Sequence, residues 1–389
     1  MDFIDLAAQQ RRIKEKIDAN IQAVLRHGSY IMGPEIKELE GKLATYVKVS
    51  HAIGCASGTD ALLMALMAYG IGPGDAILTT SFTFIATAEV ISLLGAVPVF
   101  VDIDPETFNI SPDRLTETIE AIQEGDSTHH SLQALPGMDG PIKLAPRGII
   151  AVDLFGQPAD YDRINVLAED HNLFVIEDAA QSFGAEYKGR KTCSLADVAC
   201  TSFFPAKPLG CYGDGGMCFT DNEELAVKMR SIRVHGQGSN KYENIRIGIN
   251  GRLDTLQAAI LLAKFEIFPE EISLRQEVAR RYSEGLSGHR RFHPPVVPRG
   301  YLSAWAQYSI LAEDESHRET CLSLLKKAGI PSAIYYPKPL HLQGAFANLG
   351  YRKGDFPVSE SCAQRIFSLP MYPYLVDSEQ AQILNCIKD

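Results

Sequence analysis

This sequence of 389 residues lacks several features that would place it in other classes of protein. It has no apolar stretch near the roughly 20 residues that span a bilayer, and no signal-peptide pattern at its start. Its eight cysteines form no Cys-x-x-Cys pair and no Cys/His spacing typical of a metal site. The net charge of −11 argues against a general nucleic-acid-binding role. We therefore expect no membrane span and no bound metal, and free thiols in a reducing cytoplasm.

The sequence also lacks a Gly-x-Gly-x-x-Gly fingerprint after its first expected strand, which argues against a nicotinamide-dependent dehydrogenase. Residues 51–56 predict that strand, and a small turn leads from it into a helix. The N–H groups and dipole of a helix N-terminus favour an anion, so Gly58, Thr59 and Asp60 form a candidate anion site. A serine or threonine that simply caps the helix is the alternative, and without further context it is the more common arrangement.

A lysine stands between two prolines in the stretch Ser202 to Gly210. Proline fixes φ and removes a backbone donor, so this stretch predicts a rigid loop and neither a helix interior nor a central strand. The apolar neighbours of Lys207 would disfavour the ammonium form and lower its pKa, as a lysine that bonds covalently to a carbonyl requires. The alternative is a surface lysine on a proline-rich turn.

A second candidate lies where an apolar run ends in carboxylates. Residues 173–178 follow helical sequence and predict a buried parallel strand that ends at Asp178. Open α/β sheets place ligand sites at the carboxyl ends of their strands. An aspartate there would hold a pyridine nitrogen in its protonated form and strengthen an electron sink. An aspartate that caps a following helix is the alternative.

Three motifs in this order resemble the pyridoxal-phosphate sugar aminotransferases of the DegT/DnrJ/EryC1/StrS family: residues 177–182, 202–210 and 213–216. The resemblance runs from near residue 3 to near residue 375, apart from an insertion near 121–146 that we interpret as a surface loop. Within the family, the chain is most similar to enzymes that aminate UDP-linked 3-keto-hexuronic acids for O-antigen synthesis.

The resemblance implies an α/β, fold type I architecture with a mostly parallel seven-stranded sheet. Residues 1–265 would form the large cofactor-binding domain, and residues 266–389 a smaller C-terminal α/β domain. We expect one long helix, from Leu256 to about Leu286, to join the two.

The resemblance also assigns roles to single residues. Lys207 would hold pyridoxal 5'-phosphate covalently and move the proton, while Asp178 bonds the pyridine nitrogen. Asn250 and Arg252 would reach the neighbouring subunit's site, which implies a homodimer with shared active sites. Close relatives usually carry histidine at the position of Tyr335. The other cofactor contacts implied are Gly58, Thr59, Asp60, Phe84, Gln181, Ser202 and Asn250, and the substrate contacts are Arg252, Tyr335, Tyr336 and His341.

The activity implied is amino transfer, from glutamate by the family's habit, to the 3-keto carbon of a UDP-linked 2-acetamido-2-deoxy-hexuronic acid. One alternative is an aminotransferase for a neutral 3-keto or 4-keto nucleotide sugar. A second is a pyridoxamine-dependent sugar dehydratase, but relatives of that class replace the lysine with histidine, so Lys207 argues against it. A third is a non-catalytic sugar-nucleotide-binding protein on the same scaffold.

Overall fold

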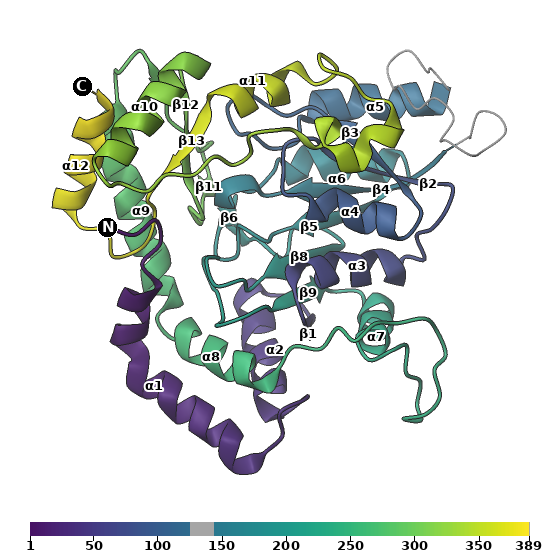
Figure 1. Cartoon of the computed structure of the whole chain (residues 1–389). Coiled ribbons are helices and arrows are strands. Elements are labelled where there is room, and N and C mark those ends of the chain that lie inside the picture. The colour runs from purple at the N-terminus through teal and green to yellow at the C-terminus, as the bar shows by residue number, and fades with distance from the viewer. Residues whose placement is uncertain (125–143, 389) are drawn as a thin grey trace.

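The computed structural model describes residues 1–124 and 144–388, and a seven-stranded sheet lies at its centre (Figure 1). The strand order is β1-β9-β8-β5-β4-β2-β3. Six strands run in one direction and β9 runs against both of its neighbours, which confirms the predicted mostly parallel α/β sheet. The strands are β1 (His51–Cys55), β2 (Asp75–Thr80), β3 (Val97–Val101), β4 (Ala145–Val152), β5 (Phe174–Asp178), β8 (Val198–Ser202) and β9 (Gly216–Thr220).

Successive residues of the central strands point to opposite faces of the sheet, and both faces are buried. In β4, Ile150 packs on one face, whereas Ile149 and Ala151 pack on the other. Helices must therefore cover both faces, as is usual for parallel sheets. The first face is covered by α3 (Gly58–Ala68), α4 (Ala86–Leu93) and α7 (Glu223–Ile232), and the second by α5 (Pro112–Glu124), α6 (Tyr161–Asp170), α2 (Pro34–Val47) and α8 (Thr255–Phe265).

The predicted long helix from Leu256 to about Leu286 is in fact two helices, α8 and α9 (Phe268–Leu286). Pro269 lies in the first turn of α9, where its missing N–H costs nothing; in the interior of one continuous helix it would remove a hydrogen bond and clash. The predicted domain boundary at 265/266 falls at this break.

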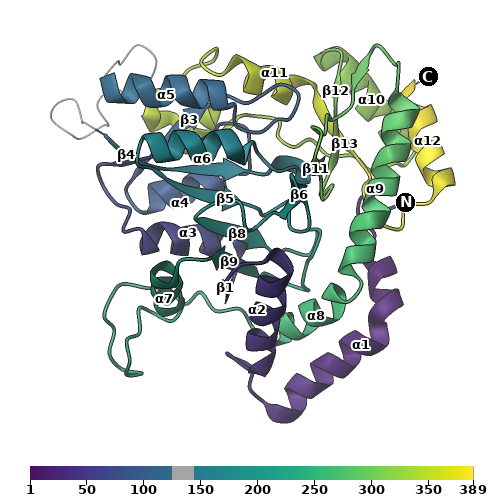
Figure 2. The same cartoon turned by 180° about the vertical axis from the view of Figure 1, so that it is seen from behind.

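The N-terminal helix α1 (Leu6–His27) packs along α8 through Ile17 and Ile260. The helix ends at Gly28, which has a φ of 70° and donates its backbone N–H to the carbonyl oxygen of Val24. The first residues of the chain contact its last part, because Met371 N donates to the carbonyl oxygen of Phe3. Both termini consequently lie on the side of the molecule that holds α9 and the C-terminal helix α12 (Asp377–Lys388; Figures 1 and 2).

The residues from α9 onward form a second core, around an antiparallel sheet of order β10-β12-β13. A third small sheet has the order β11-β6-β7. No helix among the described residues is long and apolar enough to cross a membrane. The remaining elements are β6 (Glu186–Tyr187), β7 (Arg190–Lys191), β10 (Phe292–His293), β11 (Tyr301–Leu302), β12 (Tyr308–Ala312), β13 (Ile366–Leu369), α10 (Glu315–Lys327), α11 (Pro357–Arg365), α12 (Asp377–Lys388), η1 (Leu154–Gly156), η2 (Leu340–Leu342) and η3 (Gly344–Leu349).

The predicted surface loop near 121–146 lies mostly outside the described residues. At its borders, α5 continues to Glu124 and β4 begins at Ala145.

Candidate active site

The carboxyl ends of neighbouring strands bring the candidate residues into one region. Asp178 ends β5, Ser202 ends β8, and Gly58 begins α3 shortly after β1. A Cβ built on Gly58 would stand 2.7 Å from Cβ of Ser202, so only glycine permits this close approach. The structure therefore places the predicted anion turn directly against Ser202, five residues before Lys207.

Asp178 is a buried carboxylate, 5% exposed, with two hydrogen-bond donors. Thr87 Oγ1 donates to its Oδ2 at 2.8 Å, and Ala180 N donates to its Oδ1 at 3.2 Å. Burial raises the pKa of Asp178, whereas these donors and the positive charge of Lys207 act in the opposite direction. The chain continues from Asp178 into turns, so the alternative that it caps a helix is wrong.

Lys207 lies on a tight loop between β8 and β9. Its N–H donates to the Phe204 carbonyl at 2.9 Å, and Cys211 N donates to the Phe203 carbonyl at 2.7 Å. Burial lowers the pKa of Lys207 to about 8, although the charge of Asp178 raises it. Such an amine is neutral in part near neutral pH, which makes it a better nucleophile and base than a surface lysine.

The turn before α3 contains a helix cap and also offers donors for an anion, so both interpretations of the sequence apply to it. Ser57 caps the helix, since its Oγ accepts the N–H of Asp60 at 3.0 Å. The Asp60 N–H is thus already bonded, which makes it a weaker candidate for an anion contact than the sequence suggested. The N–H groups of Gly58 and Thr59 belong to the first turn, whose donors have no partner within a helix. They and the Ser202 hydroxyl remain the candidate anion donors.

Phe84 and Tyr336 form the aromatic part of the site. Phe82 is fully buried and belongs to the core, whereas Phe84 is 55% exposed, as expected for an aromatic ring that stacks on a ligand. The Tyr336 ring lies 6.5 Å from that of Phe84. Gln181 contacts this side of the site: its Oε1 accepts Phe155 N at 2.8 Å, and its Nε2 donates to the Tyr336 hydroxyl at 3.4 Å.

The structure does not support His341 as a substrate contact. Its side chain is buried, its Nε2 lies 3.1 Å from Glu360 Oε1, and its ring packs against Phe356. The reason is that His341 belongs to η2, which turns inward against α11, whereas Tyr335 and Tyr336 precede that turn and stay partly exposed.

Asn250 and Arg252 line a depression of about 450 Å³ together with Gly213, Asp214 and Ile31. Neither Lys207 nor Asp178 is part of its lining. The Nε of Arg252 is buried and has no hydrogen-bond partner among the described residues. Buried polar groups are nearly always bonded, so an unpaired nitrogen at this position is unusual.

Comparisons with known proteins agree with this geometry. The DegT/DnrJ/EryC1/StrS aminotransferase family matches residues 11–388. The chain belongs to this family. It is 50% identical, over 96% of both chains, to the UDP-2-acetamido-2-deoxy-3-oxo-D-glucuronate aminotransferase of Pseudomonas aeruginosa. It is 38% identical to the UDP-N-acetyl-3-dehydro-alpha-D-glucosamine 3-aminotransferase of Acidithiobacillus ferrooxidans, over 99% of this chain and 96% of the relative.

Solved structures of relatives show the same fold. A family aminotransferase from Brucella abortus has a TM-score of 0.92 and 48% identity, covering 100% of this chain and 98% of that one. The NtdA structure from Bacillus subtilis, with bound cofactor PMP, has a TM-score of 0.86 and 28% identity, covering 100% and 84%. The present aminotransferase thus uses pyridoxal 5'-phosphate, and its residues fit that group: an amine of lowered pKa, a buried carboxylate, a glycine turn at a helix start and an exposed aromatic ring.

Three buried residues of the aminotransferase site were not predicted. Thr87 gives no sequence signal, because its partner Asp178 is 91 residues away. Asp153 directly follows β4, and its carboxylate accepts the hydroxyls of Tyr161 and Ser182 at 2.8 and 2.7 Å. Glu177 accepts backbone N–H groups, and burial together with the charge of Asp153 raises its pKa. The signal for Asp153 was available: like Asp178, it is a carboxylate at the end of a buried strand.

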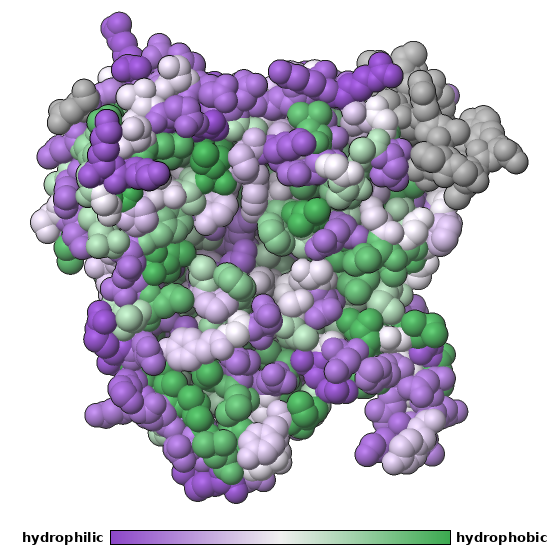
Figure 3. All heavy atoms as spheres, in the orientation of Figure 1, coloured by the Kyte–Doolittle hydropathy of each residue, from purple (hydrophilic) through white to green (hydrophobic). Residues whose placement is uncertain are grey.

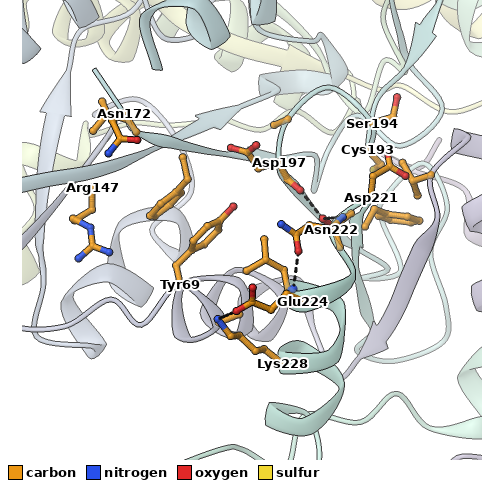
Figure 4. A pocket seen from close by; sticks show the side chains of 18 residues that line it. Tyr69, Arg147, Asn172, Cys193, Ser194, Asp197, Asp221, Asn222, Glu224 and Lys228 are labelled. Carbon is orange, nitrogen blue, oxygen red and sulfur yellow. Dashed lines mark hydrogen bonds and ion pairs between the residues drawn. The ribbon is translucent and has the colours of Figure 1, made fainter. Parts of the chain in front are cut away.

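Another cavity, of about 730 Å³, lies at the opposite edge of the sheet (Figure 4). Arg147, Asn172 and Asp197 line it near the amino ends of β4, β5 and β8. Its cationic side chains are paired, Lys228 with Glu224 at 2.7 Å and Arg147 with Asp75 at 3.1 Å. Ligand sites of open α/β sheets lie at the carboxyl ends, so this cavity is not the aminotransferase site.

Burial lowers the pKa of Lys207, and the charge of Asp178 partly opposes this effect. We expect the rate at which the apoenzyme captures the cofactor to rise with pH around about 8, as Lys207 loses its proton. Asp178→Asn removes the charge that favours the ammonium form, so the midpoint should move to lower pH. Turnover of that variant should fall by about a hundredfold or more, with a much smaller loss of cofactor affinity. A midpoint that moves to higher pH, or unchanged turnover, would contradict the role of Asp178.

Proposed function

We propose that this enzyme transfers an amino group, with glutamate as donor, to the 3-keto carbon of a UDP-linked 2-acetamido-2-deoxy-hexuronic acid for O-antigen or related polysaccharide synthesis. The observation that carries this proposal is the 50% identity, over 96% of both chains, to the Pseudomonas aeruginosa aminotransferase. Arg252 is consistent with it, because its partly exposed side chain lines a depression and a guanidinium is suited to a carboxylate.

The residues around Lys207 account for the chemistry. Bound pyridoxal phosphate supplies a carbonyl for covalent attachment and an electron sink. Lys207 would hold that group covalently through its amine and, once released as a free amine, would move the proton at the substrate carbon. Asp178 would keep the proton on the pyridine nitrogen. Burial raises the pKa of its carboxyl group, whereas its two hydrogen-bond donors and the charge of Lys207 favour the carboxylate form.

The remaining residues would hold the two ligands. Gly58, Thr59 and Ser202 donate to the phosphate, with Asp60 as a weaker contributor and Asn250 reaching it from a second subunit. Phe84 stacks on the ring. The contacts of Gln181 with Phe155 and Tyr336 support a place for this cofactor contact beside the ring and the sugar. Tyr335 and Tyr336 face the sugar.

A homodimer completes the site in this proposal. Apolar side chains are visible on the lower part of the face in Figure 3. Large exposed hydrophobic residues of the described chain include Ile31, 53% exposed, Tyr242, 87%, and Ile247, 85%. The segment after α7 that carries Tyr242 and Ile247 extends away from the body (Figure 1). Exposed apolar patches mark interaction surfaces, and a second copy would cover this one. Asn250 and Arg252 follow the same segment and would enter the partner's site.

The proposed compartment is the cytoplasm. Seven of the cysteines are buried and form no disulfide. Thiols outside disulfides persist in reducing compartments.

The alternative substrate is a neutral 3-keto nucleotide sugar, and the 38% identity to the Acidithiobacillus ferrooxidans enzyme favours it as the second candidate. The two candidates differ in the carboxylate at C6 of the sugar. Arg252 would contact that carboxylate, so its replacement distinguishes the two candidate substrates.

Replacing Arg252 tests the uronic acid directly. Arg252→Gln should raise KM for the uronate about 10- to 100-fold, the cost of one charged hydrogen bond, and should change KM for the neutral UDP-linked analogue little. The control is Arg299→Gln, which removes an equal charge from an exposed loop. Equal effects of Arg252→Gln on both sugars would contradict the carboxylate contact, and a wild-type preference for the neutral sugar would favour the alternative.

Mixing two variants with different defects tests the shared site. Lys207→Ala removes the nucleophile and should abolish turnover, whereas Arg252→Gln raises KM for the uronate at the partner's site. In a hybrid dimer, one of the two sites combines the intact Arg252 of one chain with the intact Lys207 of the other. Purified hybrids should therefore turn over the uronate with a KM close to that of wild type. A monomer by sedimentation, or a KM in purified hybrids as high as that of Arg252→Gln, would contradict the dimeric site.

A further inference from the structure

A chain of buried hydrogen bonds joins the ends of β2 and β3 to α11 and to the 335–341 loop. Ser359 Oγ donates to Asp102 Oδ1 at 2.6 Å, and Ser81 Oγ donates to Ser359 Oγ at 2.9 Å. The carbonyl oxygen of Ser81 then accepts the N–H of Leu340 at 2.7 Å. Both serines are fully buried and Asp102 is 6% exposed, so water does not compete for these bonds.

Asp102 fixes the start of α11. The helix has no side-chain cap of its own, since Phe356 occupies the N-cap position. The carboxylate of Asp102 takes that place: Oδ2 accepts Val358 N and Oδ1 accepts Ser359 N, both at 2.9 Å. A carboxylate at a helix N-terminus satisfies donors that the helix leaves unpaired and interacts well with its dipole.

A second contact ties the loop to the same helix. The Nε2 of His341 lies 3.1 Å from Oε1 of Glu360, which is the residue after Ser359. Glu360 Oε1 also accepts Gly354 N at 2.7 Å. The loop is thus held at Leu340 by the end of β2 and at His341 by α11, and these two anchors are themselves joined through the Ser81–Ser359 bond.

This series of hydrogen bonds ends at the aromatic part of the active site. Ser81 directly precedes Phe82, whose ring lies 6.2 Å from that of Tyr336, and Phe84 follows two residues later. Tyr336 itself lies four residues before Leu340 and meets Gln181. The Ser81–Ser359 bond therefore fixes the relative place of Phe84 and of the loop that carries Tyr335 and Tyr336.

We propose that Asp102, Ser359 and Ser81 are positioning residues for binding of the sugar, because they set the Tyr335–Tyr336 loop against the Phe84 side of the site. This rests on the proposed function, in which that loop faces the nucleotide sugar. None of the three contacts Lys207 or Asp178 in the described structure, so the step with the amino donor depends on them little.

The test uses Ser359→Ala and Ser81→Ala, which break the same bond from opposite ends. Ser81→Ala leaves the Asp102 cap of α11 intact, so it stays informative if Ser359→Ala folds poorly. The matched control is Ser309→Ala, which removes one hydroxyl from another fully buried serine pair, Ser309 with Ser368 at 2.8 Å, within the β10-β12-β13 sheet.

Two readouts are made on the cofactor-loaded enzyme. Hydrogen–deuterium exchange over residues 335–342 should be faster in both test variants than in wild type and in Ser309→Ala. KM for the UDP-linked keto sugar should rise about tenfold in both, while KM for glutamate and the cofactor absorbance stay within about twofold of wild type. Unchanged exchange over 335–342, or equal losses for donor and sugar, would overturn the proposal.

The exchange measurement needs no sugar, so the two proposals can fail separately. If the wild type does not turn over the uronate but exchange is faster in the test variants, the proposed substrate is contradicted. The positioning role of Asp102, Ser359 and Ser81 is then still supported. If the enzyme turns over the uronate but neither substitution changes exchange or KM, the proposed substrate is supported. The positioning role of the three residues is then overturned.

Discussion

A buried carboxylate beside a buried amine is the interaction on which this site depends. Burial raises the pKa of Asp178 and lowers that of Lys207, so it favours the neutral pair, whereas their mutual attraction favours the charged pair. Thr87 and Ala180 N donate to the carboxylate and so favour its charged form. At Lys207, burial outweighs the attraction of that charge and lowers the pKa of the amine to about 8. A protonated pyridine nitrogen would give Asp178 a cationic partner in place of Lys207, which explains why such a cofactor suits this pair.

The segment around Asp178 is held rigidly from the neighbouring strand. Asp153 N donates to the carbonyl oxygen of Asp178 at 3.1 Å, and Ser182 Oγ donates to the Asp153 carboxylate. The turn after β4 also fixes Gln181, through the N–H of Phe155. Burying Asp153 and Glu177 together is costly unless the pair keeps a proton, and burial does raise the pKa of both.

Much of this arrangement was accessible from the sequence, because it depends on local patterns. Alternating or continuous apolar runs predicted the parallel strands, and the glycine turn, the proline-flanked lysine and the carboxylate at a strand end predicted Gly58, Lys207 and Asp178. Long-range contacts were not accessible. The Thr87 donor, the inward turn that buries His341 against Glu360, and the break between α8 and α9 each depend on how distant segments pack. The roles proposed for Asn250 and Arg252 depend on the proposed second subunit, and no pattern within one chain specifies them.

The most direct measurement is the visible absorbance of the cofactor-loaded enzyme, titrated with a UDP-linked 3-amino-2-acetamido-hexuronic acid in the absence of any keto acid. This runs the sugar step backwards. The account predicts that the band of the covalently held cofactor disappears in proportion to added amino sugar, and that the neutral UDP-linked analogue is less effective. A band that ignores the uronate and responds to the neutral sugar would contradict the proposed substrate. The absence of any such band would contradict the role of Lys207.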